Sequence, residues 1–294
     1  MKKNVKEKVD VYTIVTERII KMLEENKVPW KKPWKSHMPT NMISKKEYRG
    51  LNVFMLSLTD YSSNYWMTFK QVNQLGGKIK KGEKGYPVVY WKYNEYTKEV
   101  NGENITRKAP LFRYYLVFNL DQTENIPEKK IPVINETVNE TDSIKLAEEI
   151  IRKYKDKPAI RHDRKSAFYV LEDDVIHMPP KKDFNTIEDY YSTLFHEMIH
   201  STGHKSRLDR MTKTHFGSEK YSKEEIVAEL GASFLCNNCN IANSTIKASA
   251  EYIRSWIAAL KNDKKLIVQA SSKAQKAADY ILGKKVTKEE VIFE

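Results

Sequence analysis

The sequence contains one pentapeptide whose residue types and spacing could support hydrolytic chemistry, HEMIH at positions 196–200. Histidines at positions i and i+4 lie about 6 Å apart along one face of a helix, so His196 and His200 can both reach one zinc ion with bonds of about 2.0–2.1 Å. Glu197 can hold the attacking water and accept its proton. The pattern predicts one Zn2+ ion on His196 and His200 and a catalytic Glu197, against the alternative of two surface histidines without a metal.

A helix must carry this pentapeptide, and the flanking residues predict one. Thr186, followed three residues later by Asp189, has the spacing of a capping box at a helix start. Gly203 is a typical helix stop. The apolar residues between them recur at helical spacing, and they are Ile187, Tyr191, Leu194, Phe195, Met198 and Ile199.

A hydrolytic zinc site needs a third protein ligand and one open position. His204 follows closely, but a straight helix would place it about 12 Å from His196, too far to share one ion. The metzincin pattern has a histidine ten residues after the first one, where this sequence has Ser206. The third ligand is therefore expected on another element, with His204 and Asp209 kept as lesser alternatives.

A second helix is predicted from residue 222, in the segment SKEEIVAELGASFLC. Ser222 and Glu225 have the spacing of a capping box, which would give Glu225 a structural role. Glu229 then remains as the expected third ligand, with Glu225 as the alternative. Small residues would allow this helix to approach the first one closely, and they are Ala228, Gly231 and Ala232.

The net charge of +12 is unevenly distributed along the chain. Residues 1–125 hold 23 Lys or Arg and 13 Asp or Glu, and residues 27–92 hold 13 basic and only three acidic residues together with four of the five tryptophans. Cations interleaved with aromatic rings suit single-stranded DNA, because the cations neutralise phosphates while bases stack on the rings. The alternative is that the aromatic residues fill a core and the lysines solvate a surface.

The candidate DNA-binding residues are the cations, aromatic residues and one amide of this basic segment. They are Trp30, Lys31, Lys32, Trp34, Lys35, Lys45, Lys46, Tyr48, Arg49, Asn52, Lys70, Lys78, Lys80, Lys81 and Lys84.

The pattern of elements predicts an α+β protein with two domains. Residues 10–26 have the apolar period of an amphipathic helix. Residues 86–96 and 111–120 are rich in β-branched and aromatic residues and predict two strands joined as a hairpin. Residues 121–142 have no apolar period and contain two prolines, which indicates a linker. We expect a basic α+β domain at 1–125, a linker at 126–142 and a mainly helical domain with a small sheet at 143–294.

Within the second domain, residues 143–154 predict a helix and residues 167–170 and 175–178 predict short strands. The strand at 175–178 precedes the HEMIH helix, so we expect it to offer an edge on which an extended peptide could pair.

Composition also narrows the compartment. The chain has no apolar run of 18 residues, and acidic residues stand where a secretory leader would have its apolar block, so we expect a cytoplasmic protein without membrane contact. The two cysteines, Cys236 and Cys239, form a single CxxC without a second pair. Buried thiols are favoured over a metal or redox site.

Several segments resemble the ArdC-type antirestriction proteins carried by plasmids and other mobile elements. EENKVPWKKPW (24–34), YRGLNVFML (48–56) and WMTFKQVNQLGGKIKKGEKGYPVVYW (66–91) resemble the N-terminal single-stranded-DNA-binding domain of that family. HEMIHSTGH (196–204), RLDR (207–210), FGSEKYSKEEIVAELGASFLC (216–236) and SSKAQKAADYIL (271–282) resemble its zincin-like metallopeptidase domain.

The resemblance implies zinc on His196 and His200, catalysis by Glu197 and a metal-binding glutamate in the VAE segment, which is Glu229. It also implies an antirestriction protein that binds single-stranded DNA without base specificity and cleaves an unknown protein substrate, with host restriction components as candidates. Two departures from the family pattern are visible. Asn26 stands where many relatives have glycine, and Ser201, expected to alter the wall beside the metal, stands where many have tryptophan.

Two other functions stay open at this point. In the first, the protein only coats single-stranded DNA and the metal is structural or inactive. In the second, the metal site cleaves phosphodiesters and the protein is a nuclease. The oligomeric state has no signal in the sequence.

Overall fold

The computed structural model describes residues 10–28, 38–57, 59–100, 103–132, 140–211, 218–241 and 250–284. The chain divides into two compact units, neither of which is one run of sequence. The first, called the helical unit, comprises Met1–Met38, Arg49–Leu58 and Ile134–Lys285, and the second, called the sheet unit, comprises Pro39–Tyr48, Thr59–Val133 and Val286–Glu294. The domain boundaries expected from sequence order, 1–125, 126–142 and 143–294, stay a prediction.

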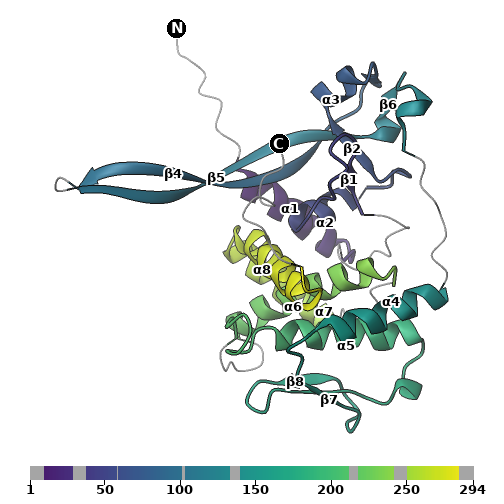
Figure 1. The fold of residues 1–294 in the computed structure, drawn as a ribbon, viewed down its shortest axis with the longest axis vertical. Helices are drawn as coiled ribbons and strands as arrows, with labels where there is room; N and C mark the ends of the chain where they lie inside the picture. The colour runs from purple at the N-terminus through teal and green to yellow at the C-terminus, as the bar shows by residue number, and fades with distance from the viewer. Residues whose placement is uncertain are drawn as a thin grey trace. The chain divides into compact units, whose positions relative to one another are not determined.

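The helical unit is built from helices and one small sheet (Figure 1). Its helices are α1 (Val11–Glu24), α2 (Leu51–Ser57), α4 (Glu140–Lys153), α5 (Ile187–Ser201), α6 (Glu219–Asn238), α7 (Ala250–Asn262) and α8 (Leu266–Ile281), and its strands are β7 (Ala159–Arg161), β8 (Phe168–Val170) and β9 (Val175–His177). Helix α6 contacts α5, α7 and α8, so it lies at the centre of the unit. No helix among the described residues is long and apolar enough to cross a membrane.

Helix α5 begins as the sequence predicts. The Thr186 side chain accepts a hydrogen bond from the backbone N–H of Asp189, and the Asp189 side chain accepts one from the Thr186 N–H. Close packing against α6 also agrees with the prediction, because a Cβ atom on Gly231 would lie 2.7–2.9 Å from the Ile199 side chain. The helix that carries HEMIH therefore packs directly against the helix that carries the candidate glutamates.

The N-cap of helix α6 lies four residues before the N-cap that the sequence suggests, Ser222. Its N-cap is Ser218, whose hydroxyl accepts a hydrogen bond from the backbone N–H of Tyr221. Ser222 consequently lies inside the helix, and its backbone N–H bonds the carbonyl of Ser218. The prediction of a capping box between Ser222 and Glu225 is therefore wrong. The Glu225 carboxylate does not cap the helix and can take another role.

The small sheet has the order β7-β9-β8. Strand β9 pairs in parallel with β7 and antiparallel with β8. The expectation that residues 175–178 offer a free edge is therefore wrong, because both edges of β9 are paired. The edge beside the HEMIH helix belongs to β8, which contacts α5.

The sheet unit contains a four-stranded sheet of order β1-β2-β5-β4. Strands β4 and β5 form a long antiparallel ribbon (Figure 1), paired from Tyr86↔Val117 to Val100↔Glu103. The predicted hairpin is confirmed but longer than expected, because the polar connection is itself paired. The elements of the unit are β1 (Thr40–Asn41), β2 (Tyr65–Thr68), α3 (Phe69–Gln74), β3 (Lys78–Ile79), β4 (Tyr86–Val100), β5 (Glu103–Asn119) and β6 (Thr123–Glu124).

The core of the sheet unit includes Met42, Met67 and Val72, with Tyr65 and Leu75 packed against it. The α+β class predicted from the sequence is confirmed. Within the expected linker, residues 133–139 lie outside the described part of the chain, and α4 begins at Glu140 instead of residue 143.

Candidate metal centre and nucleic-acid interface

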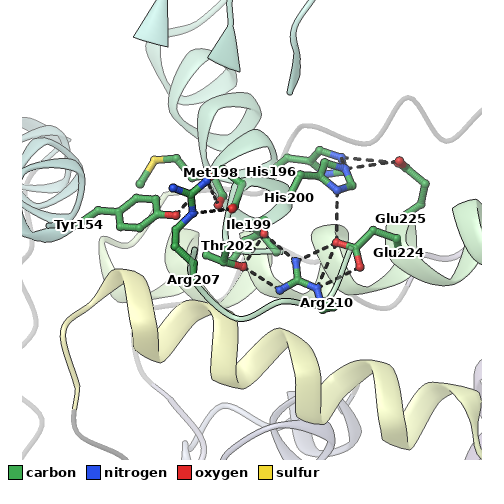
Figure 2. Close-up of polar contacts among 11 residues, drawn as sticks. Tyr154, His196, Met198, Ile199, His200, Thr202, Arg207, Arg210, Glu224 and Glu225 are labelled. Atoms are coloured by element: carbon green, nitrogen blue, oxygen red, sulfur yellow. Dashed lines mark hydrogen bonds and ion pairs between the residues drawn. The ribbon is translucent and has the colours of Figure 1, made fainter. Parts of the chain in front are cut away.

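Two imidazoles of α5 converge on one carboxylate of α6. The Nε2 atoms of His196 and His200 lie 3.0 Å apart. Oε2 of Glu225 lies 3.6 Å from Nε2 of His196, and Oε1 lies 3.4 Å from Nε2 of His200 (Figure 2). All three side chains are nearly buried, with 10–12% of each exposed. This is the arrangement of three converging donors that a metal site needs.

Glu229 lies on the far side of the first imidazole. Its Oε1 atom is 3.5 Å from Nδ1 of His196, the nitrogen that faces away from the cluster. Glu224 has the equivalent place at the second imidazole, with Oε1 3.4 Å from Nδ1 of His200. The structure thus brings Glu225, the alternative, to the two Nε2 atoms, and puts Glu229, the expected ligand, beside Nδ1 of His196.

The two lesser alternatives lie outside this cluster. The His204 ring shares a hydrogen bond of 2.7 Å with the Ser206 hydroxyl, and its Nδ1 also accepts one from the Ser206 backbone N–H. Asp209 is exposed and has a positive φ of 46° in the loop after α5. Neither residue belongs to the described group of possible metal donors.

The donor set fits a divalent metal. For tetrahedral coordination with bonds of about 2.0–2.2 Å, neighbouring donor atoms lie about 3.3–3.6 Å apart. The separations of 3.0, 3.4 and 3.6 Å between the three donors are close to that range. The cluster also buries Nδ1 of both histidines and one oxygen of Glu229 without a hydrogen bond. A cation would compensate this concentration of buried carboxylates.

The electrostatics of the cluster couple its histidines to its carboxylates. Burial lowers the pKa of His196, but the hydrogen bond with Glu225 and the charge of Glu229 outweigh burial and raise it. The pKa of His200 is well above its ordinary value for the same kind of reason, with Glu225 as the largest opposing charge. Burial raises the pKa of Glu225, but the neighbouring histidines lower it to a greater extent. A metal that binds here must therefore displace protons.

Glu197 has a different environment from the other carboxylates. It is buried, and burial raises its pKa above the ordinary value. The charges of His196 and His200 oppose that rise, as does a hydrogen bond from the backbone of Tyr169 on β8. Burial also raises the pKa of Glu229, to about 7. A glutamate whose pKa is raised holds a proton more readily than a free one, which suits a group that accepts a proton and then returns it.

The cluster opens into a pocket of about 530 Å³. One wall is the edge strand β8 with the residues before it, and another is the start of α6. Apolar and aromatic side chains contribute much of the lining, and they are Phe168, Pro179, Phe184, Met211, Tyr221 and Trp256. The pocket also exposes His196, Glu197, His200, Glu225 and Glu229. Glu197 and the three candidate metal donors thus face one cavity.

The loop after α5 holds two buried arginines (Figure 2). Arg207 pairs with Asp174 in the turn between β8 and β9, and donates a hydrogen bond of 2.7 Å to the carbonyl of Ser201. Arg210 pairs with Glu224 at 2.8 Å. The sequence pattern predicts no role for Arg207, Arg210 or Glu224, because no periodicity marks them. The RLDR segment contributes only to the family resemblance.

Comparison with known proteins identifies both parts of the chain. Residues 9–118 match the family model of the N-terminal domain of anti-restriction factor ArdC, and residues 145–273 match that of a zincin-like metallopeptidase. The crystal structure of antirestriction protein ArdC from plasmid R388, without metal, is 37% identical, with a TM-score of 0.75 over 94% of this chain and 97% of that one. The chain belongs to the ArdC family.

Other ArdC relatives extend the comparison. A Mn(II)-bound structure of R388 ArdC is 36% identical, with a TM-score of 0.75 over 94% of this chain and 98% of that one. Protein y4eC of Sinorhizobium fredii (strain NBRC 101917 / NGR234) is 33% identical over 92% of this chain and 91% of its own length. DNA primase TraC of Escherichia coli is 34% identical over 91% of this chain, and the chain spans only 26% of its length.

The two departures from the ArdC pattern have structural explanations. Asn26 has a φ of 57°, the left-handed conformation that glycine favours and that asparagine tolerates. Ser201 is fully buried, where its hydroxyl lies 3.0 Å from that of Tyr154 and donates to the carbonyl of Met198. Ser201 does not line the pocket, so the prediction that this residue alters the pocket wall beside the metal is wrong.

The predicted DNA-binding residues of this ArdC relative divide into several groups. Tyr48 and Asn52 are buried, so neither presents its side chain at the surface. Arg49 pairs with the buried carboxylate of Asp279 on α8 and thereby stabilises the helical unit. Five predicted residues lie outside the described part of the chain, and they are Trp30, Lys31, Lys32, Trp34 and Lys35. Seven are exposed lysines of the sheet unit: Lys45, Lys46, Lys70, Lys78, Lys80, Lys81 and Lys84.

An exposed apolar pair accompanies some of these lysines. Phe69, the first residue of α3, is 58% exposed, and Ile43 in the turn after β1 is 43% exposed. Two hydrogen bonds of 3.1 and 3.3 Å join the side chains of Asn41 and Gln71, which fixes that turn against the start of α3. Ile43 and Phe69 are not among the DNA-binding residues predicted from the sequence, whose aromatic members are Trp30, Trp34 and Tyr48. Trp66 is 1% exposed and belongs to the core.

Both cysteines are buried free thiols, as the sequence favours. Burial raises the pKa of Cys239 to about 12 and that of Cys236 well above its ordinary value, so neither is a reactive thiolate.

Proposed function

We propose that the helical unit is a zinc-dependent peptidase with His196, His200 and Glu225 as metal ligands. The observation that carries this proposal is the convergence of their three donor atoms beside Glu197, in a pocket bounded by the edge strand β8. Membership of a zincin-like metallopeptidase family supports it. The Mn(II)-bound relative supports a divalent metal in the family fold.

In this proposal, a bound zinc ion supplies Lewis acidity for polarising the scissile carbonyl. Glu197 takes a proton from the attacking water and transfers it to the leaving amine. The Glu229 and Glu224 carboxylates lie 3.5 and 3.4 Å from the Nδ1 atoms of His196 and His200, on the side of each ring away from the cluster, which favours a ring orientation with Nε2 facing the cluster.

The edge of β8 suits an extended peptide as substrate. Within the described part of the chain, strand β8 pairs with β9 on one side only, so the other side presents backbone groups that another strand can pair with. The same strand contacts Glu197 through the backbone of Tyr169. A peptide added to this edge would pass next to the proton-accepting carboxylate.

The sheet unit is proposed to bind single-stranded DNA without base specificity. Its match to the ArdC N-terminal domain supports this assignment. The exposed side chains of Phe69 and Ile43 offer apolar surface on which bases could lie. Lys45, Lys46 and Lys70 lie within three residues of them in sequence and would neutralise phosphates. Joined to the peptidase in one chain, this unit would raise the local concentration of the peptidase near proteins on the same DNA, which fits a role in antirestriction on mobile elements.

The decisive experiment is a cleavage screen of a denatured host proteome. Zinc-loaded wild type and Glu197→Gln are incubated separately, with and without a single-stranded oligonucleotide, and new N-termini are identified by mass spectrometry. We expect new N-termini only with wild type. Identical products from both proteins would refute the peptidase assignment and favour a DNA-coating protein.

The same reactions separate the nuclease alternative. An end-labelled oligonucleotide in the wild-type reaction should keep its full length. Shortening that depends on Glu197 would instead assign the metal site to phosphodiester cleavage.

A further inference from the structure

The loop after α5 ends in a guanidinium that is almost fully buried. The Arg210 side chain is 7% exposed, and its Nε atom lies 3.0 and 3.2 Å from the two oxygens of Glu224. Its Nη2 atom lies 2.8 Å from one of the same oxygens. A forked contact of this kind holds a carboxylate in both distance and direction.

The same guanidinium also binds the end of α5. Nη2 of Arg210 donates to the carbonyl of Ile199 at 2.7 Å, and Nη1 donates to the hydroxyl of Thr202 at 2.8 Å. Ile199 precedes His200 directly, while Glu224 precedes Glu225 directly. Arg210 therefore connects the two helices beside one metal donor from each (Figure 2).

Glu224 completes the connection to the imidazole. Its Oε1 atom lies 3.4 Å from Nδ1 of His200, while Nε2 of that ring faces Glu225. Glu224 thus lies behind the ring and cannot share an ion with Nε2. A carboxylate in this position fixes which nitrogen carries the proton and how the ring is rotated.

We propose that Arg210 and Glu224 are a positioning pair that holds His200 ready for the metal. The proposal rests on the metal-binding part of the proposed function, but not on peptide cleavage. Lysine cannot replace Arg210, because one ammonium cannot reach the carboxylate, the carbonyl and the hydroxyl in the planar arrangement that the guanidinium provides.

The test is the affinity for Zn2+ and for Mn2+, measured on the full chain by competition with a chromophoric chelator. We expect Glu224→Ala to weaken metal binding by about 10–100-fold, the usual effect of losing an outer carboxylate. Glu224→Gln keeps a carbonyl that can accept from Nδ1, so it should recover part of that loss. Arg210→Lys should weaken binding by about tenfold.

Two control variants separate positioning from general stability. Glu148→Gln removes a carboxylate that pairs with Lys181 at 2.9 Å in the same unit, and its metal affinity should equal that of wild type. Arg207→Lys alters the other arginine of the loop, so it should lower the melting temperature of the metal-free protein without lowering metal affinity.

The proposal is overturned if Glu224→Gln and Arg210→Lys, both folded by circular dichroism, bind metal as tightly as wild type. It is equally overturned if Arg207→Lys weakens binding as much as Arg210→Lys does, because the effect would then be one of stability. Should wild type itself bind no metal, the proposed function fails and this pair loses its role with it.

Discussion

The helical unit and the sheet unit use charged side chains in opposite ways. In the helical unit the functional ionisable groups are buried and paired, as with Glu225 between two imidazoles and Arg210 on Glu224. In the sheet unit the predicted DNA-binding lysines are exposed, and Phe69 beside Lys70 is 58% exposed.

This difference suits the partner proposed for each unit. A metal ion requires donors at fixed separations, so its ligands need buried partners that hold them in place. A flexible strand of phosphates and bases can adapt to a surface, so exposed cations and apolar rings are sufficient. Substitutions should therefore have large and local effects in the helical unit, and small and cumulative effects in the sheet unit.

The largest expected effect follows from removing a ligand. His196→Ala should weaken zinc binding on the order of a thousandfold, since one ligand of three carries roughly a third of the about 10–16 kcal/mol typical of structural zinc. Metal content after dialysis, measured by mass spectrometry, reports the loss. His204→Ala is the matched control, because His204 pairs with Ser206 outside the cluster and its loss should leave the metal content unchanged.

A smaller effect is expected from salt on the sheet unit. If about four phosphates are neutralised, the affinity for a single-stranded oligonucleotide should fall about 50-fold between 50 and 200 mM salt. Fluorescence anisotropy at several salt concentrations measures the slope, and oligonucleotides of different sequence should give similar values. A complex insensitive to salt, or one that prefers duplex DNA, would contradict the assignment.

Removing one exposed ring should lower the affinity for DNA less than the rise in salt does. Phe69→Ala should weaken oligonucleotide binding about tenfold, within the usual range for one stacked base. Phe69→Tyr keeps a ring and should bind like wild type. Equal affinity for all three proteins would move the contact surface away from α3.

An ion pair that supports the pocket wall of the helical unit should affect stability instead of binding. The Asp174 carboxylate accepts hydrogen bonds from Arg207 and from the Tyr169 hydroxyl, the latter at 2.7 Å. Asp174→Asn, which tolerates the φ of 50° at this position, should reduce the free energy of unfolding by about 1–2 kcal/mol. That value is at the low end for a bond to a charged group, because 30% of the Asp174 side chain is exposed.

The pH dependence of this difference has a defined sign. Burial raises the pKa of Asp174, but its bonds with Arg207 and Tyr169 lower it to a greater extent. The stabilisation is therefore present above the ordinary pKa of 3.8 and is lost as the pH falls through the lowered value. Denaturation curves of the two proteins should converge in acid, whereas Lys70→Gln in the sheet unit should change stability by less than about 0.5 kcal/mol at any pH.

Local sequence signals predicted many of the elements and the pairing of His196 with His200 in the candidate metal centre. The capping box at Thr186 and the spacing of His196 and His200 depend on neighbours along one helix, so the sequence contains them. The order of the small sheet depends on pairing between separate segments, which no local pattern reveals. The sequence therefore predicts an edge at β9, whereas β9 is the central strand and β8 lies at an edge.

The proposed third ligand, Glu225, shows the same limit. Ser222 and Glu225 have the spacing of a capping box, but the helix begins at Ser218, and nothing within the segment decides between the two starts. The roles of Arg210 and Glu224 likewise arise from a loop folding back on two helices. Contacts of that kind have no period that a sequence pattern can reveal.

The most direct test of the metal centre compares two glutamates one helical turn apart. The zinc affinity of Glu225→Gln and of Glu229→Gln is measured against wild type by chelator competition. We expect the greater loss of zinc affinity for Glu225→Gln, because the Glu225 oxygens face both Nε2 atoms. Glu229→Gln should lose about 10–100-fold, because Glu229 lies beside Nδ1 of His196 and only orients that ring. A greater loss for Glu229→Gln, with Glu225→Gln close to wild type, would contradict this expectation.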